Sequence, residues 1–366
     1  MKEFIVKDNE QQRLIKLLGK ILSNADNGFI YKMLRKKNIV LNDKKATGNE
    51  SLKTGDSIKI YFSDETFKKL SEKSSSSDKQ TLLKDGKNNG FILKDNIIYE
   101  NDNVIFINKP AGILSQKAVK DDVSIVEYLT QYLLDKGEIS KDELMTFKPA
   151  ICNRLDRNTS GIILCGKSLL GLRRLNDIIS KRELDKFYIT VVNGVLNKEL
   201  LCEALLHKNK SNNKVMIFRD IKEAKKMLTE SEISKLQVIK TGIKPLISTN
   251  EHTLLEIELI TGKTHQIRGT LSYLGFPIYG DEKYRGKDNI KINNVCNSNS
   301  YIDSKGGKHL SYQMLHAYKI VFKESYGEIG LEKKVYKSYP PKAFTDIIKK
   351  LGFKEKQLWD IIKEED

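Results

Sequence analysis

One acidic side chain stands between two basic ones near the middle of the chain. Asp156 is flanked by Arg154 and Arg157 in the segment Asn153-Arg154-Leu155-Asp156-Arg157-Asn158-Thr159-Ser160-Gly161. Nearby positive charges favour the ionised form of a carboxylate, so we expect Asp156 to remain charged. A charged carboxylate can act as a nucleophile or as a general base. A surface Asp–Arg pair that does no chemistry would give the same local pattern.

A second motif begins where the first one ends. Residues Gly161 to Ser168 match the pattern G-x-x-x-x-G-K-[ST], in which a loop cradles phosphate groups. Such a loop needs a buried strand before its first glycine and small, bent backbone between the two glycines. Here the residues before Gly161 are polar, and Ile162-Ile163-Leu164-Cys165 separates the glycines. We therefore predict a buried strand, and a P-loop nucleotidase is the less favoured alternative.

Metal and cofactor sites lack their usual sequence signals. The four cysteines contain no C-x-x-C pair; they are Cys152, Cys165, Cys202 and Cys296. No second ligand stands at zinc spacing from His265, which we expect to make a structural hydrogen bond. Lys109, which precedes Pro110, is expected to have a positional role. The sequence thus predicts chemistry without a metal and without a small-molecule cofactor.

The segment that carries these motifs mixes strands with helices. Apolar stretches predict strands at 104–107, 162–165, 187–192 and 253–260. Helices are expected at 169–179 and 343–351, and the polar residues 286–313 are expected to form an inserted surface loop. This order favours an α+β domain over residues 97–350, with a mixed, mostly antiparallel sheet and flanking helices. Residues 351–366 are expected to be a C-terminal tail.

The first 62 residues predict a separate, small and basic module. A helix around residues 30–36 has an apolar face of Ile30, Met33 and Leu34 and a basic face of Lys32, Arg35 and Lys36. Strands are expected near residues 39–41 and 58–62. Residues 1–62 contain 13 lysines and arginines against 7 acidic residues. Residues 63–96 include a serine run at 74–77 and are expected to form a flexible linker.

The overall charge indicates the class of partner. The formal net charge is +16 at pH 7, which favours a polyanion such as a nucleic acid. No stretch approaches the roughly 18 apolar residues that are needed to cross a bilayer. The chain also has no secretory pattern at its start, and its unpaired thiols suit a reducing compartment. We therefore expect a cytoplasmic protein with no membrane partner.

Two resemblances to known families agree with these patterns. Residues 1–62 resemble the S4 RNA-binding domain, through Ile30-Tyr31-Lys32-Met33-Leu34-Arg35-Lys36, Val40-Leu41-Asn42 and Thr54-Gly55-Asp56-Ser57-Ile58. Residues 97–350 resemble the RluA family of RNA pseudouridine synthases, in which R-L-D-R-x-T-S-G matches the segment around Asp156. Four further motifs follow the family's order: Asn108-Lys109-Pro110-Ala111-Gly112, Lys186-Phe187-Tyr188, Thr261-Gly262-Lys263-Thr264-His265-Gln266-Ile267-Arg268, and Leu274-Gly275-Phe276-Pro277-Ile278-Tyr279-Gly280-Asp281 with Leu315-His316-Ala317.

The second resemblance implies roles for particular residues. It implies that Asp156 is catalytic, that Tyr188 stacks on the target base, and that Arg268 pairs with Asp156 and helps to engage the RNA. Arg154 and Arg157 are expected to bind substrate as well, and Lys32, Arg35 and Lys36 to bind RNA from the S4-like module. Asn153, Lys263 and Gly269-Thr270 depart from the family's usual His, Arg and Val-His, which bears on the choice of substrate.

The resemblance also implies the reaction and the partner. We expect the protein to convert uridine to pseudouridine in RNA, with 23S (large-subunit) ribosomal RNA as the expected substrate, and to work as a monomer without cofactors. The target nucleotide must be flipped out of its helix to reach the carboxylate. A noncatalytic RNA-binding or ribosome-assembly protein on the same fold is the alternative. It predicts that Asp156→Ala keeps every function.

Overall fold

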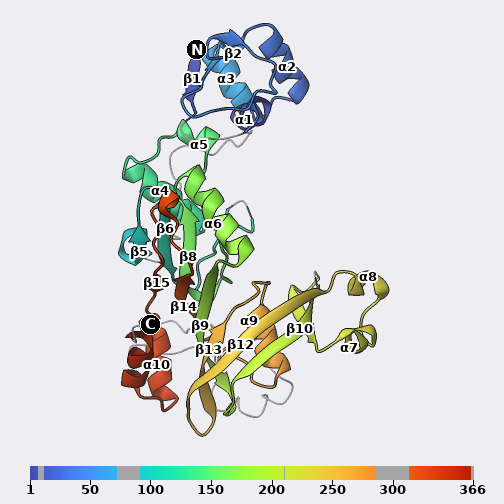
Figure 1. The fold of residues 1–366 in the computed structure, drawn as a ribbon, viewed down its shortest axis with the longest axis vertical. Coiled ribbons are helices and arrows are strands. Elements are labelled where there is room, and N and C mark those ends of the chain that lie inside the picture. The colour runs from blue at the N-terminus through green and yellow to red at the C-terminus, as the bar shows by residue number, and fades with distance from the viewer. Residues whose placement is uncertain (7–11, 72–90, 120, 210, 285–312, 364–366) are drawn as a thin grey trace.

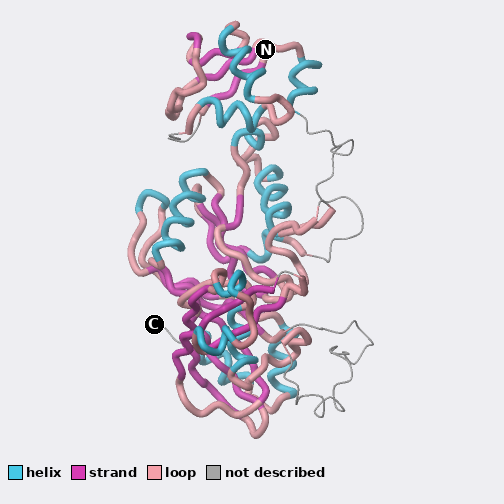
Figure 2. The backbone as a smooth tube through the Cα atoms, turned by 90° about the vertical axis from the view of Figure 1, so that its right-hand side faces the viewer, coloured by secondary structure: helices cyan, strands magenta, loops and turns pink. Residues whose placement is uncertain are grey.

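The chain forms a small sheet near its N-terminus and a long sheet that occupies most of the remainder (Figure 1). The structure, a computed structural model, describes residues 1–6, 12–71, 91–119, 121–209, 211–284 and 313–363. Of the predicted insertion at 286–313, residues 286–312 therefore lie outside the described residues. In the view turned by 90°, the N-terminal unit lies at one end of the molecule, and below it helices flank the strands on both sides (Figure 2).

The N-terminal unit is a four-stranded sheet packed against helices. The strand order is β1-β4-β2-β3, with β1 Lys2–Ile5, β2 Ile39–Leu41, β3 Lys44–Lys45 and β4 Ser57–Ile60. The helices are α1 Leu14–Ile21, α2 Asn27–Arg35 and α3 Asp64–Ser71. Asp26 caps α2 by accepting a hydrogen bond from the Phe29 amide at 2.7 Å.

The two faces of α2 are those that the sequence predicts. Ile30, Met33 and Leu34 are buried in the core of this unit, and Lys32, Arg35 and Lys36 are exposed. The predicted linker, residues 63–96, contains regular structure at both of its ends. Phe67 of α3 is buried in the N-terminal core, and Leu93 of the 3-10 helix η1 (Leu93–Asn96) is buried in the core of the large unit. Its residues 72–90 lie outside the described part of the chain.

The large sheet has eleven strands, and its pairing is mixed but mostly antiparallel, as predicted. Nine strands follow the order β11-β10-β12-β13-β9-β14-β8-β6-β5, β15 pairs with β14, and β7 pairs with β8. Only β14 and β8 run parallel among the described pairs. The strands are β5 Ile97–Glu100, β6 Val104–Lys109, β7 Ala150–Ile151, β8 Ser160–Gly166, β9 Leu184–Asn193, β10 Leu200–Asn209, β11 Lys214–Phe218, β12 Gln237–Ser248, β13 His252–Glu258, β14 Leu315–Phe322 and β15 Val335–Lys337.

The large unit also contains helices, which pack around its sheet. They are α4 Ile125–Asp135, α5 Glu143–Thr146, α6 Leu169–Lys181, α7 Ile221–Lys225, α8 Glu230–Ile233, α9 Gln266–Tyr273, the 3-10 helix η4 Gly327–Ile329, α10 Lys342–Lys350 and α11 Glu355–Lys363. The helix predicted at 343–351 is therefore α10. The expected tail at 351–366 is wrong in part, because Leu358 and Ile362 of α11 are buried in the core of the large unit.

Strand β8 is buried on both of its faces, as its continuous apolar sequence predicts. Ile163 and Cys165 face one hydrophobic core, which α4 covers, and Ile162 and Leu164 face a second core, which α6 covers. This double burial fixes the start of β8 rigidly in the middle of the sheet. The loop that carries Asp156 leads directly into it.

Candidate active site

Asp156 lies on a loop between β7 and β8 whose backbone is held from one side by Ser115. The Ser115 hydroxyl donates to the Leu155 carbonyl at 2.7 Å and accepts from the Leu155 amide at 3.0 Å. Leu155 and Ser115 are both buried. The Thr159 amide donates to the Asp156 carbonyl at 3.0 Å. The backbone at Asp156 is thus fixed by hydrogen bonds of Ser115, Leu155 and Thr159, which do not involve the carboxylate itself.

Lys109 holds the same loop from the other side. Its Nζ, which is fully buried, donates to the carbonyl oxygens of Pro110 at 2.9 Å, Ile113 at 2.8 Å and Arg157 at 3.0 Å. Burial lowers the pKa of Lys109 to about 7, while the charge of Asp156 opposes that shift. Three carbonyl acceptors match the three protons of an ammonium group, so the geometry favours the charged form. Lys109 therefore has the positional role that the sequence suggested.

Arg268 of α9 makes the closest ion pair to Asp156. Its Nη1 donates to Asp156 Oδ2 at 2.8 Å, and its Nε and Nη2 donate to the two oxygens of Asp281 at 2.6 and 2.9 Å. The guanidinium also lies over the ring of Tyr284, at 5.0 Å from the ring centre. Burial by itself would lower the pKa of Arg268, but the two carboxylates outweigh it and raise that pKa. Arg268 is therefore a permanent cation beside Asp156.

His265 approaches the same carboxylate from the start of α9. Its Nε2 lies 3.7 Å from Asp156 Oδ2, and its Nδ1 lies 2.8 Å from the Tyr284 hydroxyl. Its backbone is in the left-handed region, with φ of 52°, which is uncommon for a residue with a side chain. Burial lowers the pKa of His265 to about 4. The imidazole is therefore neutral near pH 7.

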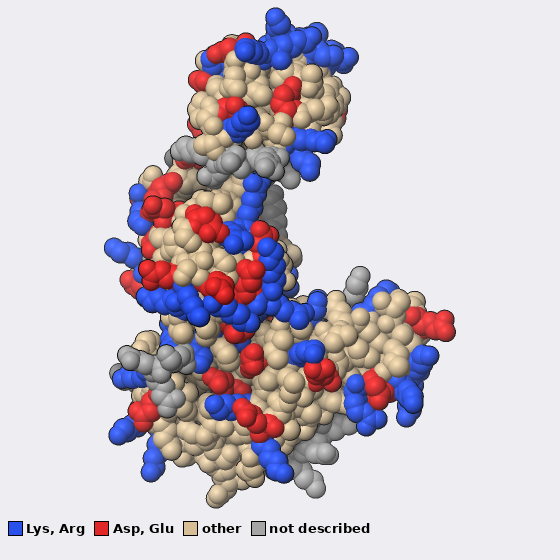
Figure 3. All heavy atoms as spheres, in the orientation of Figure 1, with Lys and Arg blue, Asp and Glu red and all other residues tan. Residues whose placement is uncertain are grey.

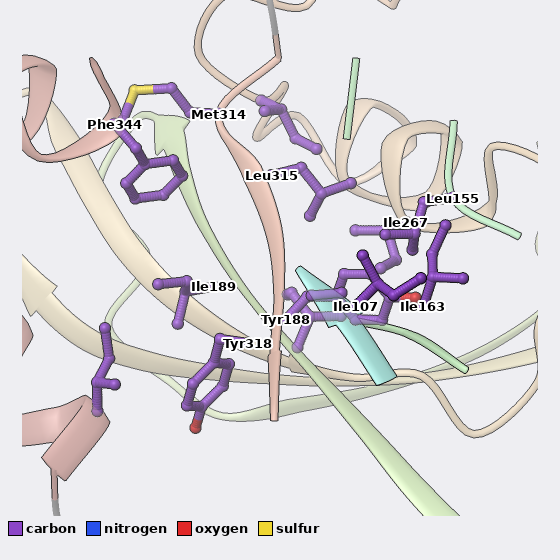
Figure 4. Close-up of a cluster of buried hydrophobic side chains, with 14 of the residues drawn as sticks. Ile107, Leu155, Ile163, Tyr188, Ile189, Ile267, Met314, Leu315, Tyr318 and Phe344 are labelled. Carbon is purple, nitrogen blue, oxygen red and sulfur yellow. The ribbon is translucent and has the colours of Figure 1, made fainter. Parts of the chain in front are cut away.

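Tyr188 forms part of the floor of the site. It lies on β9, where it pairs with Ile257 of β13 and with Ala317 of β14, and only 6% of its surface is exposed. Figure 4 shows its ring among the apolar side chains of the core, close to Ile107 and Ile163. Burial, with the nearby charge of Asp156, raises the pKa of the Tyr188 hydroxyl, so this phenol stays neutral.

These side chains line a cavity of about 340 Å³. Asp156, Tyr188 and Arg268 all contribute to its wall, and Arg154, Lys186 and Lys263 add positive charge to it. A volume of this size falls within the range of small-ligand sites and suits one nucleotide. Figure 3 shows that lysine and arginine side chains also gather across the waist of the molecule. The site thus combines an apolar floor, one carboxylate and a basic surround.

The structure corrects one expectation about the charges around Asp156. Arg154 and Arg157 are exposed, and in the described part of the chain Asp156 makes its ion pair with Arg268, while the neutral ring of His265 lies 3.7 Å from the same carboxylate oxygen. Residues next to one another in a turn direct their side chains apart, so Arg154 and Arg157 do not pair with Asp156 although they are its neighbours in sequence. Arg154 lines the cavity. Arg157 lies on the same loop, and its backbone carbonyl accepts a hydrogen bond from Lys109 Nζ. Lys32, Arg35 and Lys36 lie on the N-terminal unit, away from the cavity.

Sequence reasoning missed two residues of the site. Asp281 holds Arg268, and Tyr284 supports both Arg268 and His265. In the sequence, Asp281 is only the last residue of a family motif, and its spacing does not show with which cation it forms an ion pair. The hydrogen bond expected of His265 is present, with the Tyr284 hydroxyl as its partner.

The phosphate-loop interpretation of Gly161–Ser168 is wrong. Residues Ser160–Gly166 are the buried central strand β8, so their amides pair within the sheet and cannot surround a phosphate. Lys167 is nearly buried and makes ion pairs with Glu100 at 2.6 Å and Glu138 at 2.5 Å. Its ammonium therefore serves the structure and is not available to a nucleotide.

Among the described residues, no group of three or more His, Cys, Asp or Glu side chains is arranged to hold a metal ion. No helix in the same part of the chain has the length and apolar character that a membrane crossing requires.

Comparisons with known proteins agree on one family. The family described as RNA pseudouridylate synthase matches residues 103–273. An uncharacterized RNA pseudouridine synthase of Mycoplasma genitalium is 32% identical over 323 residues, which cover 88% of each chain. The ribosomal large subunit pseudouridine synthase C of Rickettsia felis is 33% identical over 337 residues, which cover 91% of this chain and 95% of the relative.

Two other comparisons cover less of this chain. The ribosomal large subunit pseudouridine synthase D of Borreliella burgdorferi is 34% identical over 192 residues, which cover 51% of this chain and 54% of the relative. The solved structure of human RNA pseudouridylate synthase domain containing 4 has a TM-score of 0.52 and 19% identity, and covers 71% of this chain and 94% of that chain. This structural likeness concerns the fold.

Proposed function

This chain belongs to the family of RNA pseudouridine synthases and isomerises uridine in RNA, and we propose that Asp156 is its catalytic residue and large-subunit ribosomal RNA its substrate. The observation that carries the site assignment is the contact between Asp156 Oδ2 and Arg268 Nη1, 2.8 Å apart, in a cavity floored by Tyr188. Such a pair places a carboxylate beside a fixed cation where a nucleotide can reach it.

The reaction rearranges bonds within one nucleotide. The N1–C1′ bond breaks, the uracil turns, C5 bonds to C1′, and the proton on C5 leaves while N1 gains one. One ionised carboxylate is enough to begin this sequence, either by attacking the sugar–base unit or by removing a proton from it. Both routes require Asp156 to be charged and within reach of the sugar.

The remaining residues have roles in binding. Flipping the nucleotide out of its helix costs a few kcal/mol. Stacking on Tyr188 offsets part of that cost, because a base–aromatic contact contributes about 1–3 kcal/mol. Arg268 holds Asp156 and contributes positive charge toward the RNA backbone. Arg154 on the cavity wall and Arg157 on the exposed loop add positive charge for the phosphates.

The substrate class follows from the names of the relatives and from the N-terminal unit. Relatives from Rickettsia felis and Borreliella burgdorferi are named as ribosomal large subunit pseudouridine synthases. Residues 1–62 act as an S4-like RNA-binding domain, whose Lys32, Arg35 and Lys36 contact phosphates. Residues 63–96 connect it to a catalytic domain at 97–350. The protein works as a monomer in the cytoplasm, where ribosomal RNA is modified.

The test uses RNA whose uridines carry tritium at C5. Isomerisation expels that hydrogen to water, so the wild-type protein is expected to release label from large-subunit ribosomal RNA. Asp156→Asn keeps the shape of the side chain but removes its charge, and we expect it to release no label above background. Lack of release by the wild type would exclude this substrate, and an unchanged rate in Asp156→Asn would refute the assignment of Asp156.

A further inference from the structure

The hydroxyl of Tyr284 connects the edge strand of the sheet to the site. Tyr284 is 7% exposed, and its oxygen accepts a hydrogen bond from the Val215 amide of β11 at 2.8 Å. The same oxygen lies 2.8 Å from His265 Nδ1. The ring of Tyr284 lies beneath the guanidinium of Arg268. One side chain therefore touches both of the groups that approach Asp156.

These contacts favour one tautomer of His265. A backbone amide can only donate, so the Tyr284 oxygen accepts from Val215 and must place its own proton elsewhere. Within the described residues, the acceptor in reach of that proton is His265 Nδ1. Nδ1 of a neutral imidazole that accepts carries no proton, so the proton of the ring is on Nε2.

The N–H on Nε2 faces one particular oxygen of Asp156. Nε2 lies 3.7 Å from Oδ2, the same oxygen that accepts from Arg268 Nη1 at 2.8 Å. At 3.7 Å the contact is electrostatic and is too long for a direct hydrogen bond. Oδ1 has no hydrogen-bond partner among the described residues. The Arg268 cation and the Nε2–H of His265 therefore both face Oδ2, whereas Oδ1 accepts no hydrogen bond from the described residues.

We propose that Tyr284 is a positioning residue, which holds His265 as the neutral Nε2–H tautomer so that Asp156 is restrained through Oδ2 and offers Oδ1 to the uridine. This inference rests on the proposed role of Asp156. Tyr284 acts through His265 and does not touch the substrate itself.

The other states of His265 would work against Asp156. With the proton on Nδ1, the Nε2 lone pair would face Oδ2 and repel it. With protons on both nitrogens, the imidazolium would compete with Arg268 for the carboxylate. The charged groups around the ring oppose one another: Asp156 and Asp281 favour the imidazolium, whereas Arg268 and Lys283 disfavour it. The Tyr284 hydroxyl favours the neutral ring, because it donates to the bare Nδ1.

The first test reads the tautomer directly. Nitrogen-15 nuclear magnetic resonance of the full-length protein, labelled at histidine, distinguishes a protonated ring nitrogen from a bare one. The signals of His265 are identified by their loss in His265→Gln. We expect a protonated Nε2 and a bare Nδ1 in the wild type at pH 7, and a mixture of tautomers in Tyr284→Phe. A wild-type ring with its proton on Nδ1, or with two protons, would overturn the proposal.

The second test measures catalysis with a matched control. Tyr284→Phe removes only the hydroxyl and keeps the ring beneath Arg268. We expect kcat for tritium release to fall about tenfold with KM nearly unchanged, because binding is retained while the carboxylate is less well oriented. In Tyr284→Phe, the acid limb of the plot of kcat against pH is expected to move to higher pH, because the His265 ring takes a second proton more easily without the hydroxyl. Tyr273→Phe removes an exposed hydroxyl from α9 and is expected to match the wild type.

Two replacements of His265 test whether the N–H on Nε2 is the group that supports activity. Glutamine places an amide N–H near the position of Nε2, whereas asparagine reaches only to the position of Nδ1. Asparagine tolerates the left-handed backbone of this position better than glutamine. We expect His265→Gln to keep more activity than His265→Asn despite that backbone preference. The reverse order, or an unchanged kcat in Tyr284→Phe, would refute the proposal.

Failure of this inference can be told apart from failure of the proposed function. If wild-type protein releases no tritium, the substrate or the role of Asp156 is wrong, and the resonance measurement still decides the tautomer. If the wild type is active, Asp156→Asn is inactive and Tyr284→Phe is fully active, only the positioning role of Tyr284 is wrong.

Discussion

Arg268 donates two hydrogen bonds to Asp281, from Nε at 2.6 Å and from Nη2 at 2.9 Å, and both side chains are buried. This fork-shaped contact fixes the plane of the guanidinium and leaves Nη1 for Asp156. Asp281 therefore sets the direction from which the Asp156 carboxylate receives its positive partner, and it does so through Arg268, whose Nη1 lies 2.8 Å from Asp156 Oδ2.

The first prediction concerns Asp281→Asn. The amide can accept one hydrogen bond but carries no charge, so Arg268 is less firmly held and Asp156 gains freedom. We expect tritium release to slow by at least about tenfold and the free energy of unfolding to fall by about 1–3 kcal/mol. Urea denaturation and the release assay measure the two effects. Asp346→Asn, which removes one member of an exposed pair with Lys342, is expected to change stability by less than about 1 kcal/mol.

The second prediction concerns Gly161, at the start of β8. Its φ is +115°, and a Cβ there would lie 2.2 Å from the Ala317 carbonyl oxygen of β14. Gly161→Ala must push the two strands apart, and we expect it to lower stability by more than about 3 kcal/mol, because backbone strain adds to the clash. Gly19→Ala in α1 meets nothing within 4 Å and is expected to be neutral or stabilising. Equal melting temperatures for the two variants would contradict this reading.

The third prediction concerns pH and His316, which is fully buried between Ser160 and Ser338. Burial lowers the pKa of His316 from 6.5 to about 4. The unfolded chain therefore takes up a proton that the folded protein excludes, and stability falls as the pH drops from 6.5 toward 4. We expect a loss of up to about 3 kcal/mol from this group. Urea denaturation of His316→Gln should show a weaker dependence on pH over that range, since His265 remains in both proteins.

The fourth prediction concerns the N-terminal unit. Because Phe67 of α3 packs into its core, the deletion that respects the structure removes residues 1–71. We expect the remainder to stay folded and to bind RNA more weakly. Replacing Lys32, Arg35 and Lys36 with alanine in the full chain should lower the slope of log affinity against log salt by about 2–3, since each lost phosphate contact contributes about 0.7–0.9. Weakening that does not depend on salt would refute the role of these three residues.

Much of the fold follows from local patterns. The apolar run of β8 and the two faces of α2 depend on residues that are close in sequence, so periodicity alone indicates them. The prediction of a tail at 351–366 is wrong in part, because the burial of Leu358 depends on a core built from distant strands. The antiparallel extension formed by β10, β11 and β12 likewise carries no strong local signal, since its strands are only partly buried.

In the site, too, some features follow from local sequence and others depend on residues that are distant in the chain. The resemblance of the motifs around Asp156, Tyr188 and Arg268 predicted related roles for these residues, and in the structure all three line one cavity. The partners of the carboxylate were not predictable from charge order, because Arg268 is 112 positions away from Asp156 and the arginines beside it point outward. Tyr284 was missed for a related reason, since its hydroxyl acts through a contact with a histidine 19 positions earlier.

The position of β14 has a consequence for how the protein is made. This strand comes from the last part of the chain, yet it lies between β8 and β9, which bear the loop of Asp156 and the ring of Tyr188. A ribosome must therefore synthesise the chain at least through Phe322 before these two strands can be joined. We expect nascent chains released before Phe322 to be inactive in RNA modification.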